Sequence, residues 1–206
     1  MLCIIDFGMG NLRSINRKLR SVGISSEISS DTKVISSADM LILPGVGNFA
    51  KAMYNLNDLG LIELLNQKVI IERIPILGIC LGMQLFTEYS EEGNCEGFGW
   101  VKGRTQKFSF ESDNKNRVPH VGWNKVKTFD KSILMDGFDK DKRFYFTHSY
   151  HVVGDDPAAK FLKTDYGYEF DSVVEKDNLF AVQFHPEKSH FGGLKIISNF
   201  VNFHET

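Results

Sequence analysis

The sequence predicts an α/β fold: an open, mostly parallel central sheet flanked by helices, with an antiparallel or mixed β extension in the C-terminal half. Three observations support this prediction. Over roughly the first ninety residues, short apolar runs alternate with longer stretches of helical period, as they do in βαβ units. The apolar runs end at turns that contain glycine. From about Gly97 onward, aromatic and β-branched residues alternate and helical periods become rare.

The N-terminal half contains three predicted strands and one well-marked helix. Residues 2–7 form a short, continuous apolar run that is typical of a buried strand. A helix follows and ends at Gly23; its apolar residues at three- and four-residue spacing are Leu12, Ile15, Leu19 and Val22. Residues 40–43 and 76–79 are two further apolar runs. Because ligands in such sheets bind outside the carboxyl ends of the strands, we expect the turns after all three runs to share one rim.

The C-terminal half is predicted to contain shorter strands and a final helix. The alternating pattern predicts strands at residues 100–102, 107–110, 143–146 and 180–184, and the polar segment 111–117 is typical of an exposed loop. A helix from about Gly192 should cover the sheet, since its apolar residues recur at helical spacing: Leu194, Ile197, Phe200 and Val201. No linker or repeat interrupts the chain, so we expect a single domain over residues 1–206.

Composition and charge exclude several classes of protein. The 24 basic and 26 acidic residues give a formal net charge of -2, without the basic excess of a nucleic-acid-binding or anionic-membrane-binding protein. The 3 cysteines are too few and too scattered for a disulfide framework or a four-ligand zinc site, which favours a reducing compartment. The longest apolar run, residues 74–83, is about half of the ~20 residues that a membrane span needs, and no secretory signal is visible. We expect a cytoplasmic protein with no metal and no cofactor.

Gly78-Ile79-Cys80-Leu81-Gly82 has the form of a nucleophile elbow with cysteine in place of serine. It lies between an apolar strand and a predicted helix. The two glycines fit a tight strand-to-helix turn that leaves no room for a Cβ, and a helix N-terminus behind Cys80 favours the thiolate. The alternative is that Cys80 is a small buried apolar residue, which is the usual fate of a free cysteine. Cys3, inside a strand, and Cys95, in a polar loop, fit that alternative better.

A cysteine nucleophile needs a base, and His185 is the histidine best placed to serve. Phe184-His185-Pro186-Glu187 ends a predicted strand, and residues two apart in an extended segment point to the same side. Glu187 can therefore accept from one imidazole nitrogen and leave the other free to face a thiol, which is the logic of a catalytic triad. By itself the segment could also be a simple strand-ending turn. The other histidines carry no comparable signal: His120, His148, His151, His190 and His204.

Attack on a carbonyl also requires an oxyanion hole that stabilises the negative charge on oxygen. Removal of one hydrogen-bond donor from such a hole typically lowers kcat about 100-fold to 1000-fold. The backbone N–H of Leu81, at the start of the predicted helix, is the natural first donor. The loop Pro44-Gly45-Val46-Gly47 ends another strand and could supply a second donor from Val46 or Gly47. The same glycines are equally compatible with a tight turn that has no catalytic role.

Taken together, the segment 78–84, the loop 44–47 and the segment 184–187 resemble the class I (triad) glutamine amidotransferases. The resemblance spans nearly the whole chain. It implies a glutaminase in which Cys80 attacks the side-chain amide of glutamine, ammonia leaves, and water hydrolyses the resulting thioester. It assigns Cys80 as the nucleophile, His185 as the general base and then acid, and Glu187 as the orienting carboxylate. The remaining implied substrate contacts, partly through backbone atoms, are Gln84, Ser149, Tyr150 and His151.

Within that family, residues 5–12, 119–124 and 185–189 are similar to members that supply ammonia to a (β/α)8-barrel cyclase. The resemblance implies a heterodimer that makes imidazole glycerol phosphate and an aminoimidazole carboxamide ribotide in histidine biosynthesis. A partner is also expected on chemical grounds, because ammonia released into neutral water is mostly protonated and no longer nucleophilic. Exposed aromatic and cationic residues are typical interface anchors, so the docking surface is predicted near Asn11, Trp123 and Lys188.

Three alternatives remain open at this point. After residue 189 the chain continues with His190 and Phe191, where the histidine-pathway members more often have glutamine; this resembles paralogues that supply ammonia for bacterial surface-glycan amidination. A second alternative is a cysteine hydrolase of peptides or γ-glutamyl compounds on the same fold. The third is a non-catalytic regulatory subunit, against which the intact set of Cys80, His185 and Glu187 argues.

Overall fold

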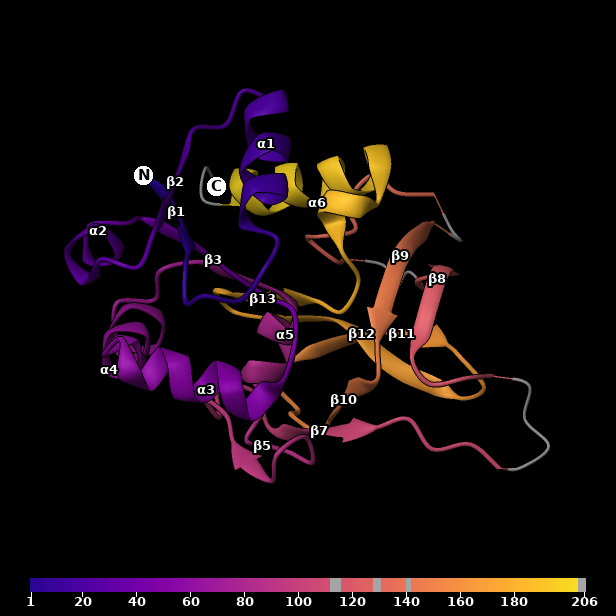
Figure 1. Cartoon of the computed structure of the whole chain (residues 1–206). Helices are drawn as coiled ribbons and strands as arrows, with labels where there is room; N and C mark the ends of the chain where they lie inside the picture. Colours follow the sequence, from indigo (N-terminus) through magenta and orange to yellow (C-terminus); the bar gives the residue numbers. More distant parts are fainter. Residues whose placement is uncertain (112–115, 128–130, 140–141, 204–206) are drawn as a thin grey trace.

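A computed structural model describes residues 1–111, 116–127, 131–139 and 142–203, and its central feature is one sheet of 11 strands (Figure 1). Its N-terminal part is parallel, as β1 pairs with β2 and β3, β3 with β4, and β4 with β13. In spatial order these strands are β2 (Ser26–Ser29), β1 (Leu2–Ile5), β3 (Met40–Gly45), β4 (Ile76–Cys80) and β13 (Leu179–Val182). The predicted α/β class and parallel core are confirmed.

The sheet continues beyond β13 with mostly antiparallel strands, which confirms the predicted C-terminal extension. In spatial order they are β12 (Glu169–Lys176), β10 (Tyr150–Gly154), β7 (Gly103–Lys107), β5 (Tyr89–Ser90) and β6 (Cys95–Glu96), with β11 (Lys160–Asp165) paired to β12. A separate antiparallel ribbon is formed by β8 (His120–Lys125) and β9 (Arg143–His148). Of the predicted loop 111–117, residues 112–115 lie outside the described residues, as does His204.

Helices cover both faces of the parallel part, as βαβ connections require. Figure 1 shows α1 (Leu12–Ser21) and α6 (His190–Asn202) on one side of the sheet and α3 (Phe49–Asp58) and α4 (Leu61–Asn66) on the other. The side chains of β1 alternate between the two layers: Leu2 and Ile4 pack in the cluster that contains α1 and α6, whereas Cys3 and Ile5 pack in the cluster that contains α3 and α4. The remaining helical segments are α2 (Thr32–Ser36), the π-helix Gln67–Ile71, α5 (Leu81–Leu85) and the 3-10 turn Pro186–Lys188.

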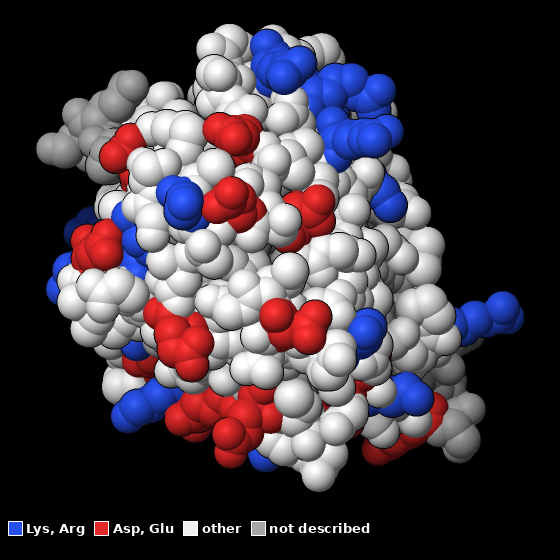
Figure 2. Space-filling view, turned by 60° about the vertical axis from the view of Figure 1, so that its left-hand side comes forward, with Lys and Arg blue, Asp and Glu red and all other residues white. Residues whose placement is uncertain are grey.

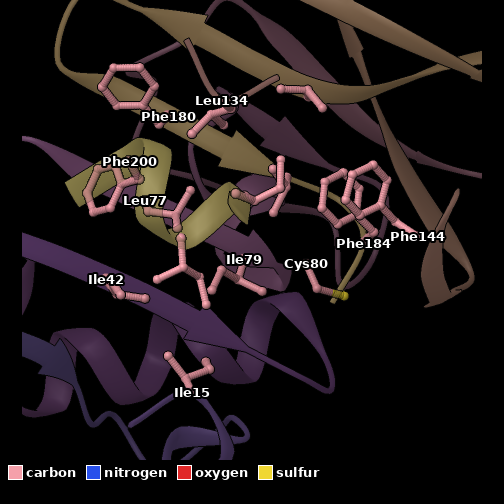
Figure 3. Packing of buried hydrophobic residues seen from close by; sticks show 14 of the residues in the cluster. Ile15, Ile42, Leu77, Ile79, Cys80, Leu134, Phe144, Phe180, Phe184 and Phe200 are labelled. Carbon is pink, nitrogen blue, oxygen red and sulfur yellow. The ribbon is translucent and has the colours of Figure 1, made fainter. Parts of the chain in front are cut away.

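The hydrophobic core reaches the site predicted from the sequence. Figure 3 shows the sulfur of Cys80 at the edge of the cluster beneath α1 and α6, close to Phe184 and Phe144. The rings of Phe144 and Phe184 stack with their centroids 4.0 Å apart. Phe184 directly precedes His185, so this buried aromatic pair anchors the turn that carries the predicted base.

Four predicted elements differ from the structure. The predicted strand 180–184 is β13, which covers Leu179–Val182 and pairs parallel to β4 as well as antiparallel to β12. Residues 100–102 are not a strand: Trp100 is buried, stacks on Phe98 and donates its indole N–H to Asn66, so its aromatic character serves packing against α4. Of residues 107–110, only Lys107 belongs to a strand, because Phe108 leaves the sheet to enter an aromatic cluster. The last helix begins at residue 190 rather than near Gly192, because the turn before it runs directly into the first helical residue.

Surface charge follows the balanced composition. Figure 2 shows acidic and basic side chains interspersed over one face, with a group of basic residues at its upper right. Within the described parts of the chain, no helix has both the length and the apolar character needed to cross a bilayer.

Candidate active site

The site is built around a strained backbone at Cys80. This residue ends β4 and directly precedes α5, and its φ of 55° lies in a region that non-glycine residues rarely adopt. The flanking glycines permit the turn: a Cβ on Gly78 would lie 2.8 Å from the carbonyl oxygen of Gly82, and a Cβ on Gly82 would lie 1.8 Å from that of Leu43. The predicted strand-to-helix elbow is therefore present, and its glycines are required by close backbone contacts.

His185 and Glu187 form a buried pair just beyond the end of β13, with Glu187 in a 3-10 turn rather than in the extended segment predicted from the sequence. Nδ1 of His185 lies 2.9 Å from Oε1 of Glu187, which also accepts from the side chain of Asn11 at 3.4 Å. The turn is held by the backbone N–H of His185, which donates to Tyr145, and by the hydroxyl of Ser189, which donates to the carbonyl of His185. Nε2 of His185 is buried without a hydrogen-bonding nitrogen or oxygen among the described residues.

The electrostatics of this pair favour a protonated imidazole when the thiol has lost its proton. Burial lowers the pKa of His185, but interactions with Cys80 and with Glu187 outweigh burial and raise it to about 10. Burial likewise raises the pKa of Glu187, yet its hydrogen bond from His185 outweighs that effect and the net pKa is lowered. Glu187 therefore stays ionised while His185 exchanges a proton.

The nucleophile opens into a cavity of about 400 Å³. Gly45, the last residue of β3, is paired with Cys80 across the sheet, so the loop after β3 lies beside the sulfur. The structure brings together most of the residues predicted from the sequence: the cavity is lined by Val46, Gly47, Cys80, Leu81, Gln84, Ser149, Tyr150 and Lys188, together with Glu92, Thr147 and His148. A larger hollow of about 570 Å³ lies beside α1 and β2 but contains none of the predicted site residues.

His151 is not brought to this cavity. Successive residues of a strand face opposite sides, so Tyr150 borders the cavity whereas the buried side chain of His151 points into the aromatic cluster around Phe108. There its ring nitrogens pair with the carbonyl of Val152 and the hydroxyl of Tyr168. Any contact of His151 with a ligand in the cavity is therefore left to its backbone.

Two polar residues at the site were not predicted from the sequence. Gln183 is fully buried and its Nε2 donates to the sulfur of Cys80 at 3.6 Å. A polar residue inside the apolar run 180–184 was the available signal. Glu92 supplies a carboxylate to the cavity wall and accepts from the backbone N–H of Phe49; its position in a polar turn gave no signal.

The residues predicted for a docking surface lie around the back of the His185–Glu187 turn. Asn11 contacts Glu187 directly, and the ammonium of Lys188 lies 5.6 Å from the ring centroid of Tyr145. Trp123 is 44% exposed and stacks on His190 with their ring centroids 5.1 Å apart, so it is not a core aromatic residue.

The other two cysteines lie outside the cavity. Burial raises the pKa of Cys3 to about 11, which keeps this thiol protonated and inert at neutral pH. Burial also raises the pKa of Cys95, and its thiol donates to the carbonyl of Glu96. Cys80 is thus the cysteine that combines a strained turn, a neighbouring histidine and a cavity, an arrangement suited to nucleophilic attack on a carbonyl carbon.

Comparison with known proteins identifies the class. The sequence model of the family described as "Glutamine amidotransferase class-I" matches residues 3–202, so the chain belongs to the class I glutamine amidotransferases. Among its relatives are imidazole glycerol phosphate synthase subunit HisH 2 of Methanococcus maripaludis, 49% identical over 98% of both chains, and subunit HisH 1 of the same organism, 44% identical over 98% of both chains. A crystal structure of a glutamine amidotransferase shares the fold with a TM-score of 0.74 at 14% identity, covering 99% of each chain.

Proposed function

We propose that this chain hydrolyses L-glutamine to glutamate and ammonia through a thioester on Cys80. It then passes the ammonia to a (β/α)8-barrel cyclase subunit, which forms imidazole glycerol phosphate and an aminoimidazole carboxamide ribotide. The observation that carries the proposal is the position of Cys80 at a cavity, with the buried His185–Glu187 pair on the adjacent strand end. Residues 1–206 act as one glutaminase domain in this proposal, since a single sheet takes strands from both halves of the chain.

The reaction has two steps that share one base. Nε2 of His185 holds the proton taken from the Cys80 thiol, and the resulting thiolate attacks the side-chain amide carbon of glutamine. The C–N bond then breaks as His185 returns the proton to nitrogen, so ammonia leaves and a γ-glutamyl thioester remains. A water molecule that loses its proton to His185 attacks this thioester, the C–S bond breaks, and glutamate and the thiol are released.

The surrounding residues have supporting roles in the proposal. Glu187 holds the imidazole in the productive tautomer and stabilises its charged form. The backbone N–H of Leu81, with that of Val46 or Gly47, meets the negative charge that develops on the carbonyl oxygen, because these residues border the cavity beside the sulfur. Glutamine is bound by the side chain of Gln84 and by the segment that contains Ser149 and Tyr150, and His151 contributes only through its backbone.

The relatives support a synthase partner, because they are named as subunits of imidazole glycerol phosphate synthase. We place the partner on the surface formed by Asn11, Trp123 and Lys188, which surrounds the turn of the predicted base. Such a heterodimer would protect ammonia from protonation by delivering it directly. We assign the assembly to the cytoplasm, where histidine biosynthesis takes place.

Ammonia release from glutamine tests the proposal. The purified chain is assayed alone and mixed with the histidine-pathway cyclase subunit of its source organism carrying its bound ligand, and a large rise on mixing is expected. Cys80→Ala should abolish hydrolysis in both assays, while Cys3→Ala serves as the matched control and should retain activity. Residual activity of the Cys80 variant above about a thousandth of wild type would contradict the assignment, because triad residues act as a unit.

The same assay separates the alternatives. Two of the relatives, HisH 1 and HisH 2, come from the same organism. The shared subunit name is therefore compatible with paralogues that deliver ammonia to different synthases. No rise on mixing, with Cys80 still labelled by a glutamine-analogue electrophile, would indicate a paralogue that feeds another synthase, such as one for glycan amidination. High activity without a partner on extended γ-glutamyl or peptide substrates would indicate a general cysteine hydrolase. Failure to label Cys80 even with the partner present would indicate a non-catalytic subunit.

A further inference from the structure

Two buried histidines and one partly buried asparagine have no part in the reaction steps above, and one of the histidines, His148, lies at the cavity wall. They are Asn124 and His120 on β8 and His148 at the end of β9. Nδ1 of His120 lies 3.0 Å from Nε2 of His148, and Nδ2 of Asn124 lies 3.3 Å from Nε2 of His120. Nδ1 of His148 lies 2.7 Å from the carbonyl oxygen of Tyr150, which borders the cavity.

The hydrogen bonds at the two ends of this group fix every proton in it. A carbonyl oxygen can only accept, so Nδ1 of His148 carries a proton towards Tyr150. At the other end, Oδ1 of Asn124 accepts from the backbone N–H of Lys125 at 2.8 Å and Nδ2 donates to the carbonyl of Asp165 at 2.7 Å, which fixes the orientation of the amide. The second Nδ2 proton of Asn124 therefore donates to His120.

The two histidines must then both be neutral and protonated at Nδ1. Nε2 of His120 accepts from Asn124, so Nδ1 of His120 holds the proton and donates it to Nε2 of His148. A second proton on either ring would set two donors against each other. Burial agrees with this assignment, because it lowers the pKa of His120 to about 4 and the pKa of His148 well below its usual value.

The hydrogen bonds continue from the carbonyl of Tyr150 to the nucleophile. That oxygen also accepts from Nε2 of Gln84 at 2.9 Å, and the other Nε2 proton of Gln84 goes to Oε1 of Gln183 at 3.2 Å. Nε2 of Gln183 in turn donates to the sulfur of Cys80 at 3.6 Å. Because both protons of the Gln84 amide are used, its Oε1 is the atom left to accept from a ligand in the cavity.

We propose that Asn124, His120 and His148 are positioning residues for the glutaminase reaction: they hold the Tyr150 carbonyl, and through it the amide of Gln84, in the orientation that binds glutamine. The inference rests on the proposed function. It assigns a role to the His120–His148 pair as a neutral relay, that is, a chain of hydrogen bonds that runs from Asn124 through both histidines to the Tyr150 carbonyl. Asn124 sets the direction in which these hydrogen bonds are donated.

Two substitutions of His120 separate hydrogen bonding from packing. His120→Phe keeps an aromatic ring that can stack on Tyr166 and Phe146, whose ring centroids lie 3.9 Å and 4.8 Å from that of His120, but removes the donor to His148. His120→Asn loses the ring but places an amide N–H near the position of Nδ1. Tyr166→Phe is the matched control, since it alters a ring neighbour of His120 without touching the relay.

The assay is the rate at which a glutamine-analogue electrophile labels Cys80, measured against analogue concentration, with thermal unfolding to verify the fold. His120→Phe should raise the half-saturating concentration about 10-fold, the effect of one lost hydrogen bond at a buried acceptor. His120→Asn should restore it to within about threefold of wild type, and Tyr166→Phe should leave it unchanged. A Phe variant that matches wild type, or an Asn variant that is weaker than the Phe variant, would overturn the proposal in favour of a packing role.

Nitrogen NMR of the wild-type protein gives a second readout that does not depend on activity. With 15N-labelled histidine at pH 7, His120 and His148 should each show a protonated Nδ1 and an unprotonated Nε2. An Nε2–H tautomer or an imidazolium at either residue would overturn the relay. If wild-type Cys80 is not labelled at all, the proposed glutaminase function fails instead, and the two failures are thereby distinguished.

Discussion

The sharpest test of the triad geometry is the substitution Glu187→Gln, which removes a charge and preserves the size of the side chain. In the native site Oε1 of Glu187 accepts from Nδ1 of His185 at 2.9 Å, and Oε2 is buried with no hydrogen-bond partner among the described residues. The negative charge is thus directed at His185, where a positive charge forms each time the base takes a proton.

The size of the effect follows from that distance. Two unit charges whose centres are roughly 4 Å apart attract by about 4 kcal/mol at an effective dielectric constant of about 20. A glutamine that still accepts from the imidazole retains about 1 kcal/mol as a neutral hydrogen bond. The difference of about 3 kcal/mol corresponds to a fall in kcat of roughly 100-fold. Because Glu187 does not line the cavity, KM for glutamine should change by less than about threefold.

Steady-state ammonia release measures both constants, with the partner present where it activates. The matched control is Glu175→Gln, since Glu175 is an equally buried carboxylate that accepts from Ser132 and from the backbone of Leu134, away from the cavity. This control should change stability and leave kcat within about twofold. A Glu187→Gln enzyme that is folded and retains kcat within about tenfold of wild type would refute the charge-stabilisation argument.

Three further predictions follow from other parts of the molecule. Gly193→Ala should destabilise the fold by several kcal/mol or prevent expression, because its Cβ would lie 1.8 Å from the carbonyl oxygen of Pro186. Gly192→Ala should change stability by less than about 1 kcal/mol, because its Cβ would meet the flexible end of Lys142 at 3.2 Å and the ring of Phe144 at 3.4 Å. Equal melting temperatures for the two variants would contradict the close approach at Gly193. Trp123→Ala should weaken association with the cyclase by roughly 10-fold or more in calorimetry while the unpartnered chain keeps its basal glutaminase rate, and unchanged affinity would place the docking surface elsewhere. The pKa of His185 is raised to about 10 in the folded chain from about 6.5 when unfolded, so the folded chain retains a proton that the unfolded chain releases. The free energy of unfolding should therefore fall as pH rises from about 7 to 10. Urea unfolding of His185→Gln should show a shallower fall with pH, and an identical slope would argue against the raised pKa.

The arrangement of the proposed triad was predictable from the sequence because its signals are local. The glycines at 78 and 82 mark a turn that only a strand-to-helix junction with close backbone contacts requires, and those contacts are present. Glu187 is two residues from His185, so their pairing is local in the chain, although a 3-10 turn and not an extended strand brings the two side chains together. The apolar runs likewise specified β1, β3 and β4 and the apolar periods the first and last helices, whereas β2, which has no such run, was not predicted.

Other features depended on residues that meet only after folding. Trp100 looked like part of a strand, yet it is a packing residue because its indole finds Asn66 on another element. Gln183 reaches Cys80 across 103 positions of sequence, and His120 reaches His148 only because β8 and β9 pair in one register.

The sequence by itself therefore determined the fold class and predicted the nucleophile and its base, since alternation, helical period and turn chemistry are properties of neighbouring residues. The tertiary structure decided which polar atoms face one another in the interior. It turned His151 away from the cavity by strand alternation and aligned His120 with His148, which lines the cavity. A hydrogen bond requires a donor–acceptor distance that is correct to within a few tenths of an ångström. No local pattern of residues specifies such distances between strands that are far apart in the chain.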